Sequence, residues 1–348
     1  MGARRLSDRF LGWVRGWFAR GSAQPVRGRG PLDHVIILDG TLSSLVPGRE
    51  TNAGLTFKLL REAGHASIYY EAGIQWHGWR SARDIISGRG INRQIRRAYG
   101  YLSSRYRPGD RIYLMGYSRG AFAVRSLAGI IDLIGLLRAE EATERNVRQI
   151  YRLYERDPTG ATAQAFAQAF CHPDTRIEMV GVWDTVKALG LRLPVLWQLT
   201  EAHHAFHNHD LGRHVNRGFH ALARDETREA FAPVLWTTPL DHGGQLEQVW
   251  FPGTHGDVGG QLGGVEAARP LANIPLVWML SKLEGCGVIL PDRWRDRFPT
   301  DPAAPSCGTW HGLGVFFLLR RPRRMGQDPS ERQYIEKEST GDLVSAAE

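Results

Sequence analysis

The sequence has no long apolar run, only three cysteines and very little lysine. No apolar stretch approaches the ~18 residues that span a bilayer, so an integral membrane protein is not predicted. The cysteines are far apart and follow neither metal-ligand nor disulfide spacing, which indicates a reducing compartment. No cleavable secretory signal is visible. Because 42% of the residues are apolar and 23% are charged, the chain can bury a sizeable core.

The basic charge is concentrated near the N-terminus. Residues 1–30 contain seven arginines and one aspartate, so they carry +6 of the net charge of +8. On a helical projection, the apolar side chains of residues 6–18, Trp13 and Trp17 among them, share one face opposite the arginines. Three interpretations stay open: a terminal helix packed on its own protein, contact with an anionic membrane surface through residues 4–20, or a frayed tail weakened by Gly12 and Gly16. The nearly neutral remainder argues against a nucleic-acid partner.

After a glycine-rich linker, predicted strands and helices alternate. The strands are expected at 34–38, 67–70, 111–115, 177–182 and 248–251, and the helices at 52–60, 92–106, 121–137, 140–156, 161–170, 219–231 and 273–284. This alternation predicts an α/β fold in which helices cover both faces of a mostly parallel sheet, preceded by the N-terminal amphipathic helix.

We divide the chain into three parts. Residues 1–30 form the basic extension and linker, residues 31–320 form the main domain, and residues 321–348 form a polar tail. Insertions into the main domain are expected near 136–172 and 190–215.

The segment Gly116-Tyr117-Ser118-Arg119-Gly120 matches the pattern G-x-S-x-G. The pentapeptide alone is a weak signal, but it lies between a predicted strand and a predicted helix, as a nucleophile elbow requires. Gly116 and Gly120 would let the tight turn close, and the N-terminus of the next helix would face charge that develops on a substrate. Ser118 is therefore a candidate nucleophile.

A serine nucleophile needs a base and an orienting carboxylate, in the chain order Ser, Asp or Glu, His for this type of elbow. Asp184 follows the predicted strand at 177–182, and His255 follows the predicted strand at 248–251. Asp257 is a rival carboxylate, which we expect to shape the loop around His255.

Several segments carry a family resemblance: LDGT at 38–41, TN at 51–52, PGDRIYLMGYSRGAFAVRSLAGII at 108–131, VGVWDTV at 180–186, FHALARDETREAFAPVLW at 219–236 and WFPGTHGDVGG at 250–260. In this order they resemble the bacterial α/β-hydrolase family known as domain of unknown function 2235, related to the catalytic domain of type VI secretion lipase effectors. The resemblance covers roughly residues 33–285.

The resemblance implies esterase or phospholipase chemistry. We expect no metal or cofactor. The resemblance assigns Ser118 as nucleophile, Asp184 as orienting acid and His255 as general base. It also implies an oxyanion hole made by backbone N–H groups at Gly40 or Thr41 and at Arg119. We expect Asp39 and Asp257 to support these groups without contacting the substrate.

Two other motifs are less informative. The DGT turn is also found in haloacid-dehalogenase phosphatases, but these need an aspartate two positions before Asp39, where this chain has Ile37. A dense group of histidines lacks the H-E-x-x-H pattern, so we expect a polar loop and no metal site; its members are His203, His204, His207, His209 and His214.

Three further polar residues have alternative roles. His220 lies in a predicted helix and is expected to pack or bond locally, not to act as the base. Arg119 could contact a phosphate or carboxylate of a substrate, and internal pairing of Arg119 and Arg125 is equally open.

The sequence thus predicts a serine hydrolase of carboxylic esters, with a lipid or phospholipid as the preferred substrate. The alternative is a non-catalytic hydrolase-fold binding module tethered to a membrane surface. We expect a cytoplasmic protein that associates peripherally with membranes, and export without a cleavable signal stays open. The sequence does not predict the oligomeric state.

Overall fold

The computed structural model describes residues 29–73, 89–186, 210–238, 244–310 and 319–335. The chain divides into two units, Met1–Pro31 and Leu32–Glu348. The amphipathic helix predicted within residues 1–30 lies outside the described residues. None of the helices in the described ranges is long and apolar enough to cross a membrane.

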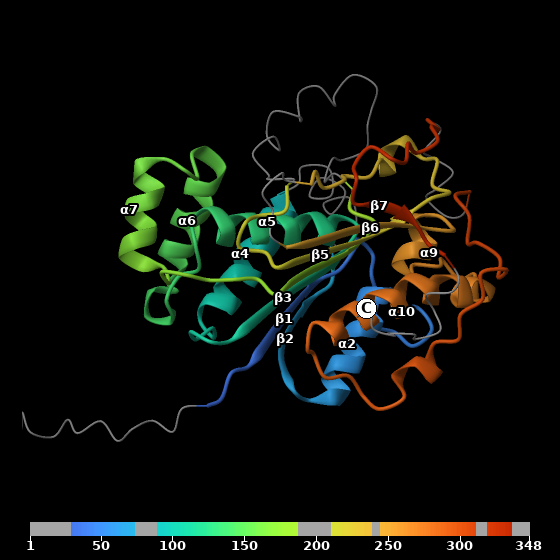
Figure 1. Cartoon of the computed structure of the whole chain (residues 1–348), viewed down its shortest axis with the longest axis horizontal. Coiled ribbons are helices and arrows are strands. Elements are labelled where there is room, and N and C mark those ends of the chain that lie inside the picture. Colours follow the sequence, from blue (N-terminus) through green and yellow to red (C-terminus); the bar gives the residue numbers. More distant parts are fainter. Residues whose placement is uncertain (1–28, 74–88, 187–209, 239–243, 311–318, 336–348) are drawn as a thin grey trace, which may run out of the picture. The chain divides into compact units, whose positions relative to one another are not determined.

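The second unit contains a seven-stranded sheet in the order β2-β1-β3-β4-β5-β6-β7, in which every neighbouring pair is parallel (Figure 1). The strands are β1 (Asp33–Leu38), β2 (Ala66–Glu71), β3 (Arg111–Tyr117), β4 (Met179–Trp183), β5 (Arg217–Ala223), β6 (Gln245–Phe251) and β7 (Glu331–Gln333).

Helices cover both faces of this sheet, which confirms the predicted fold class. One apolar cluster joins the sheet to α4 (Arg89–Ser103), α5 (Arg119–Leu133), α6 (Glu144–Arg156) and α7 (Ala161–Phe170). The other joins it to α2 (Asn52–Ala63), α9 (His255–Gly259) and α10 (Arg269–Gly285). Figure 1 shows α4 to α7 on one side of the sheet and α2 and α10 on the other. Short 3-10 turns occupy Ala139–Glu141, Glu229–Phe231, Glu266–Ala268 and Trp294–Arg297.

The local sequence explains why most of these elements form. Strand β1 is an unbroken apolar run with its last five residues buried, as expected for a strand covered on both faces. Thr51 begins helix α2 by accepting a hydrogen bond from the Gly54 amide at 2.9 Å, and Gly64 ends it in the left-handed conformation.

The helix predicted over 219–231 is wrong. Strand β5 occupies Arg217–Ala223, and a loop follows it to the turn at Glu229–Phe231. Its last six residues are buried, so both faces of the strand carry core side chains. A short apolar run with two buried faces has no distinctive periodicity, and a strand of this kind resembles a helical segment in sequence.

Three residues of the expected polar tail join the sheet. Residues 331–333 form β7 beside β6, and no strand was expected there. The Trp250 indole donates to a Glu331 carboxylate oxygen at 2.8 Å and helps to hold this short edge strand. Of the two expected insertions, that near 136–172 contains α6 and α7. The one near 190–215 falls largely outside the described residues.

The turn between β3 and α5 is packed without room for side chains. A Cβ atom on Gly120 would lie 2.0 Å from the Leu38 carbonyl oxygen, and one on Gly116 would lie 2.7 Å from backbone atoms of Gly120. The start of α5 therefore rests directly on the end of β1, which positions Ser118 at the carboxyl edge of the sheet.

We predict that Gly120→Ala lowers the free energy of unfolding by roughly 3 kcal/mol or more, because the backbone of β1 cannot move away from the added methyl group. Gly285→Ala is the matched control. Its Cβ meets nothing within 4 Å, so the change should raise stability by about 0.5 kcal/mol. Urea denaturation followed by circular dichroism measures both, and equal stabilities would contradict this packing.

Candidate active site

Ser118 occupies the sharp turn between β3 and α5. Its backbone has φ 57° and ψ −119°, a strained conformation for a residue that is not glycine. The Ser118 amide donates to the Trp183 carbonyl at 3.0 Å, which ties the turn to the end of β4. Buried except for 7% of its surface, Ser118 is rigidly presented at one point.

The structure brings Ser118, Asp184 and His255 together, although 137 residues separate Ser118 from His255. His255 is the first residue of α9, directly after β6. Its Nε2 atom lies 2.9 Å from Ser118 Oγ, and its Nδ1 atom lies 2.5 Å from Asp184 Oδ2. In the neutral ring, a proton on Nδ1 donates to Asp184 and leaves Nε2 free to accept the Ser118 proton.

Aromatic side chains hold the His255 ring in this position. The Tyr117 ring centroid is 4.9 Å from that of His255, and the Phe231 ring centroid is 4.8 Å away. The Tyr117 hydroxyl also donates to the His255 carbonyl at 3.1 Å. The imidazole is thus packed by apolar surface and hydrogen-bonded through both nitrogens.

Asp184 is fully buried at the end of β4, with φ 40°. Its Oδ1 atom accepts the Ala223 amide at 3.0 Å. Two guanidinium nitrogens of Arg323 donate to its carboxylate, at 2.6 Å to Oδ1 and 2.9 Å to Oδ2. Burial alone would raise the pKa of Asp184, but the charge of Arg323 and the hydrogen bonds from His255 and Arg323 hold that pKa well below its usual range.

Glu226 is a supporting residue that the sequence analysis missed. The His255 amide donates to Glu226 Oε2 at 3.2 Å. Arg228 donates through Nε to Oε1 at 2.9 Å and through Nη2 to Oε2 at 2.6 Å. Burial would raise the pKa of Glu226, but the hydrogen bonds and charge of Arg228 lower it. The residue lies within the FHALARDE segment used for the family resemblance, which was the available signal.

In the loop after β1, one backbone amide has a different hydrogen-bond partner from the one expected. The Gly40 amide, expected in an oxyanion hole, donates instead to the adjacent Asp39 carboxylate at 2.7 Å. The Thr41 amide makes no hydrogen bond with a described residue. The Arg119 amide is at the first position of α5, where helical N–H groups have no partner within the helix. Thr41 and Arg119 therefore offer the available donors.

A family model described as the catalytic domain of Tle1-like phospholipase effectors of type VI secretion matches residues 33–282. The chain belongs to this family of hydrolases. The resemblance stated from the sequence motifs is thereby confirmed.

Individual relatives are more distant. An uncharacterized protein of Saccharomyces cerevisiae, YEL023C, is 29% identical over 230 residues, which are 58% of this chain and 32% of that protein. The chain thus spans about a third of the length of this curated relative.

Three solved structures show weak similarity. An uncharacterized protein from Pseudomonas aeruginosa has TM-score 0.46 and 16% identity, over 86% of this chain and 53% of that one. A Tle1 effector bound to the VgrG spike has TM-score 0.36 and 18% identity, over 69% and 53%. A butyrate-bound esterase from Thermogutta terrifontis has TM-score 0.37 and 13% identity, over 77% and 89%.

In this Tle1-like domain, Asp39 and Asp257 both shape loops. Asp39 accepts the Thr51 and Tyr70 hydroxyl groups at 2.6 and 2.7 Å. Burial raises the pKa of Asp39 to about 6, although these hydrogen bonds and that from Gly40 lower it. Asp257 accepts the Thr254 amide at 2.7 Å and the Cys307 amide at 2.8 Å, and so fixes the turn that begins α9.

His220 and Arg125 are bound internally. His220 lies in β5, not in a helix, and its Nε2 accepts the Thr185 amide at 3.1 Å. Burial lowers the pKa of His220 to about 3, so it is a neutral residue that secures the backbone beside Asp184. Arg125 donates to the carbonyls of Val234 and Leu235, and its guanidinium lies over the Trp236 ring. Burial lowers the pKa of Arg125 to about 9.

Unlike Arg125, Arg119 makes no side-chain hydrogen bond or ion pair with another described residue. Burial lowers the pKa of Arg119 to about 10, so the guanidinium stays charged at neutral pH. The sequence left two roles open for Arg119, contact with a substrate and internal pairing. Within the described ranges, Arg119 forms no internal pair.

The histidine group and the cysteines supply no other site. His203, His204, His207 and His209 lie outside the described residues, and His214 pairs with Asp132 at 2.8 Å. Within the described part of the chain, no three histidine, cysteine or acidic side chains form a metal-binding group. Cys171, Cys286 and Cys307 are free and buried, and burial raises the pKa of each thiol. A thiolate nucleophile is therefore disfavoured.

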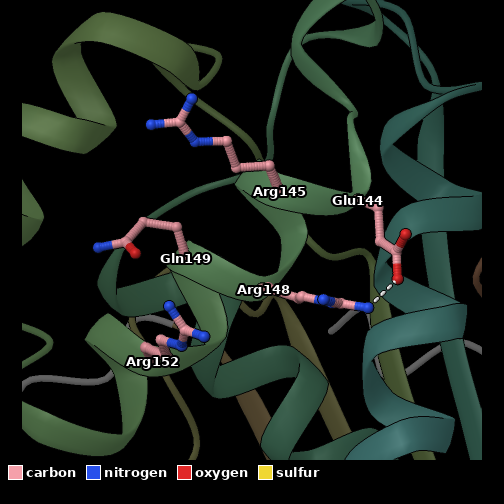
Figure 2. Close-up of a pocket in the computed structure, with 5 residues that line it drawn as sticks. All are labelled: Glu144, Arg145, Arg148, Gln149 and Arg152. Carbon is pink, nitrogen blue, oxygen red and sulfur yellow. Dashed lines mark hydrogen bonds and ion pairs between the residues drawn. The ribbon is translucent and has the colours of Figure 1, made fainter.

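A surface pocket on α6 is separate from these residues. Figure 2 shows the side chains that line it, with Arg148 directed toward Glu144 in an ion pair; they are Glu144, Arg145, Arg148, Gln149 and Arg152. A second pocket adds Arg93, Arg96 and Arg97 from α4. The nearly neutral net charge beyond residue 30 gives no sign of these arginines, because a net charge does not show where charges cluster on the surface.

We predict that Asp39 makes stability depend on pH. Its folded pKa of about 6 exceeds the ordinary 3.8, so the folded state retains a proton that the unfolded state has lost, and stability falls as pH rises through this interval. Relative to Asp39→Asn, the wild-type free energy of unfolding should fall by roughly 3 kcal/mol between about pH 4 and about pH 7.

The control for this measurement is Asp225→Asn. Folding lowers the pKa of Asp225. Its ionised carboxylate therefore stabilises the folded state, and this stabilisation is lost only as pH falls below the ordinary pKa of an aspartate. The free energy of unfolding should show no such loss between pH 4 and pH 7. Chemical denaturation across this pH range tests both variants. A constant difference between wild type and Asp39→Asn would show that Asp39 is already ionised in the folded state.

Proposed function

We propose that this chain is a serine hydrolase that cleaves carboxylic esters through Ser118, His255 and Asp184. The observation that carries the proposal is the pair of contacts at His255, 2.9 Å to Ser118 Oγ and 2.5 Å to Asp184 Oδ2. A serine hydroxyl is a weak nucleophile until a base accepts its proton. The chain order Ser, Asp, His is the one that accompanies a nucleophile elbow in α/β-hydrolases.

In the first step, Ser118 Oγ attacks the ester carbonyl carbon while its proton passes to His255 Nε2. The carbonyl π electrons move to the oxygen and form a tetrahedral oxyanion. Asp184 keeps the imidazole proton on Nδ1 and stabilises the imidazolium that forms. The low pKa of Asp184 serves this role, because the carboxylate remains an anion.

The oxyanion requires hydrogen-bond donors at a fixed position. We propose the Arg119 amide as one donor and the Thr41 amide as the second. Asp39 contributes indirectly: it binds the Gly40 amide at 2.7 Å and the Thr51 hydroxyl at 2.6 Å, and thereby orders the turn that carries Thr41. Gln261 Nε2, which donates to the Thr41 carbonyl at 3.0 Å, holds the same turn from the other side.

Collapse of the intermediate transfers the Nε2 proton of His255 to the leaving alcohol and produces an acyl-serine. Water then attacks the acyl carbon, with His255 accepting a proton from the water and returning one to Ser118 Oγ. The strained φ of Ser118 holds the hydroxyl at the same position throughout, so no rearrangement of the turn is needed between the two halves of the reaction.

For the substrate we propose a lipid ester, with phospholipids as the preferred class. The support is the family match to a phospholipase effector domain over residues 33–282. The Arg119 guanidinium, which pairs with no described residue, lies next to the nucleophile in sequence and adds a cationic group that would suit an acidic headgroup.

The test is Ser118→Ala, assayed on a series of p-nitrophenyl esters and on phosphatidylglycerol and phosphatidylethanolamine vesicles. We expect kcat to fall by roughly 10⁴-fold or more, because attack requires the hydroxyl group. Labelling by a fluorophosphonate probe should disappear while the circular dichroism spectrum is unchanged. Ser126→Ala is the matched control, since Ser126 lies on α5 and donates to the Phe122 carbonyl at 3.0 Å.

Full activity of Ser118→Ala would end the proposal. A well-folded wild type that forms no adduct at Ser118 and hydrolyses none of the esters would favour a non-catalytic binding module built on the hydrolase fold.

A further inference from the structure

Residues 319–335, here called the C-terminal strap, cross the loop that follows β5. Its first residues pair with this loop: the Glu229 amide donates to the Leu319 carbonyl at 3.0 Å, and the Arg321 amide donates to the Thr227 carbonyl at 2.7 Å. Its later residues are anchored by Asp328, which accepts the Thr238 amide at 2.7 Å, and by β7. The strap is therefore fixed on both sides of Arg323.

The Arg323 side chain extends from the strap into the interior and is only 4% exposed. Its Nη1 atom donates to Asp184 Oδ1 at 2.6 Å and to the Ala223 carbonyl at 2.8 Å. Its Nη2 atom donates to Asp184 Oδ2 at 2.9 Å and to the Phe231 carbonyl at 2.5 Å. One guanidinium thus binds both carboxylate oxygens and also the two ends of the loop after β5.

This arrangement answers a physical requirement of Asp184. A carboxylate with no solvent exposure needs a counter-charge and hydrogen bonds to stay ionised. The His255 ring supplies a hydrogen bond through Nδ1. Arg323 supplies the charge, and its planar fork also fixes the plane of the carboxylate.

We propose that Arg323 is a positioning residue for the reaction of the preceding section: it holds Asp184 ionised and aimed at His255 Nδ1, so that the strap completes the active site. This inference rests on the proposed function, because it gives Arg323 a role in turnover through Asp184. It also explains why a polar segment about 70 residues beyond His255 is docked against the sheet.

The charge of Arg323 also affects protonation of the Asp184–His255 pair. Among the described residues, the titratable or charged groups that face this pair are Arg323 from the strap, Tyr117 from β3, His220 from β5, and Glu226 with Arg228 from the loop after β5. Arg323 contacts Asp184 directly and opposes the arrival of a further positive charge on the pair. Removing it should make the pair easier to protonate.

The experiment compares Arg323→Gln, Arg323→Lys and the control Arg324→Gln, which makes the same chemical change at an exposed neighbour. Two rates are measured from pH 5 to pH 9: inactivation by a fluorophosphonate probe, and hydrolysis of p-nitrophenyl butyrate. Arg323→Gln should lower kcat roughly 10- to 100-fold and move the acid limb of both profiles to higher pH. Arg324→Gln should leave both unchanged.

Arg323→Lys distinguishes charge from geometry. Because lysine keeps the positive charge but not the planar fork, we expect kcat between the other two values and an acid limb close to that of wild type. If Arg323→Gln does not fold, Arg323→Lys decides the question: a lowered kcat at unchanged KM supports the proposal, and a wild-type kcat overturns it.

Other outcomes also contradict it. A folded Arg323→Gln with the wild-type rate and pH profile would overturn the proposal. The proposal would also be overturned if activity fell only in proportion to the amount of folded protein, the acid limb of the pH profile did not move, and Arg323→Lys were no more active than Arg323→Gln. If wild type itself is never labelled at Ser118, the proposed function fails; if wild type is labelled and the Arg323 variants match it, only this inference fails.

Discussion

The candidate site depends on keeping an ionised carboxylate inside the protein. Asp184 has no exposed surface, and an unpaired charge in such a place would cost several kcal/mol. Its partners come from three separate parts of the chain: the Ala223 amide after β5, the His255 ring at the start of α9, and Arg323 on the strap. Through these contacts, the Asp184 carboxylate links the sheet, the loop after β6 and the strap.

Parallel topology explains why the other two groups are within reach. Ser118, Asp184 and His255 follow β3, β4 and β6, and the carboxyl ends of parallel strands lie at the same edge of a sheet. Strand β5 separates β4 from β6, so the Asp184 carboxylate and the His255 ring span the end of this strand. His220, buried in β5, accepts the Thr185 amide, and Glu226, in the loop after β5, accepts the His255 amide. The same constraint that orders the strands thus positions the supporting residues.

Most of the framework could be predicted from local sequence, whereas two parts could not. The apolar runs of β1 and β3, the cap at Thr51 and the glycines around Ser118 carry strong local signals. Strand β5 was mistaken for a helix because a strand buried on both faces shows no alternation between polar and apolar residues. Arg323 was missed because it lies among arginines of a polar segment, and composition does not reveal which of them points inward. The resemblance implied an oxyanion hole at Gly40 or Thr41, and no local signal in the sequence shows that the Asp39 side chain binds the Gly40 amide.

Local sequence patterns are sufficient to predict the fold class, the family and the order of the three candidate residues, because turns, apolar runs and glycine spacing are local properties of the chain. Packing in three dimensions sets the distances between those residues, places the counter-charge beside Asp184 and pairs the Gly40 amide with the Asp39 carboxylate. It also decided where charge gathers: the near-neutral body proved to hold arginines clustered on α4 and α6. These are properties of packing, since the free energy of a buried charge depends on which groups surround it and not on their separation along the chain.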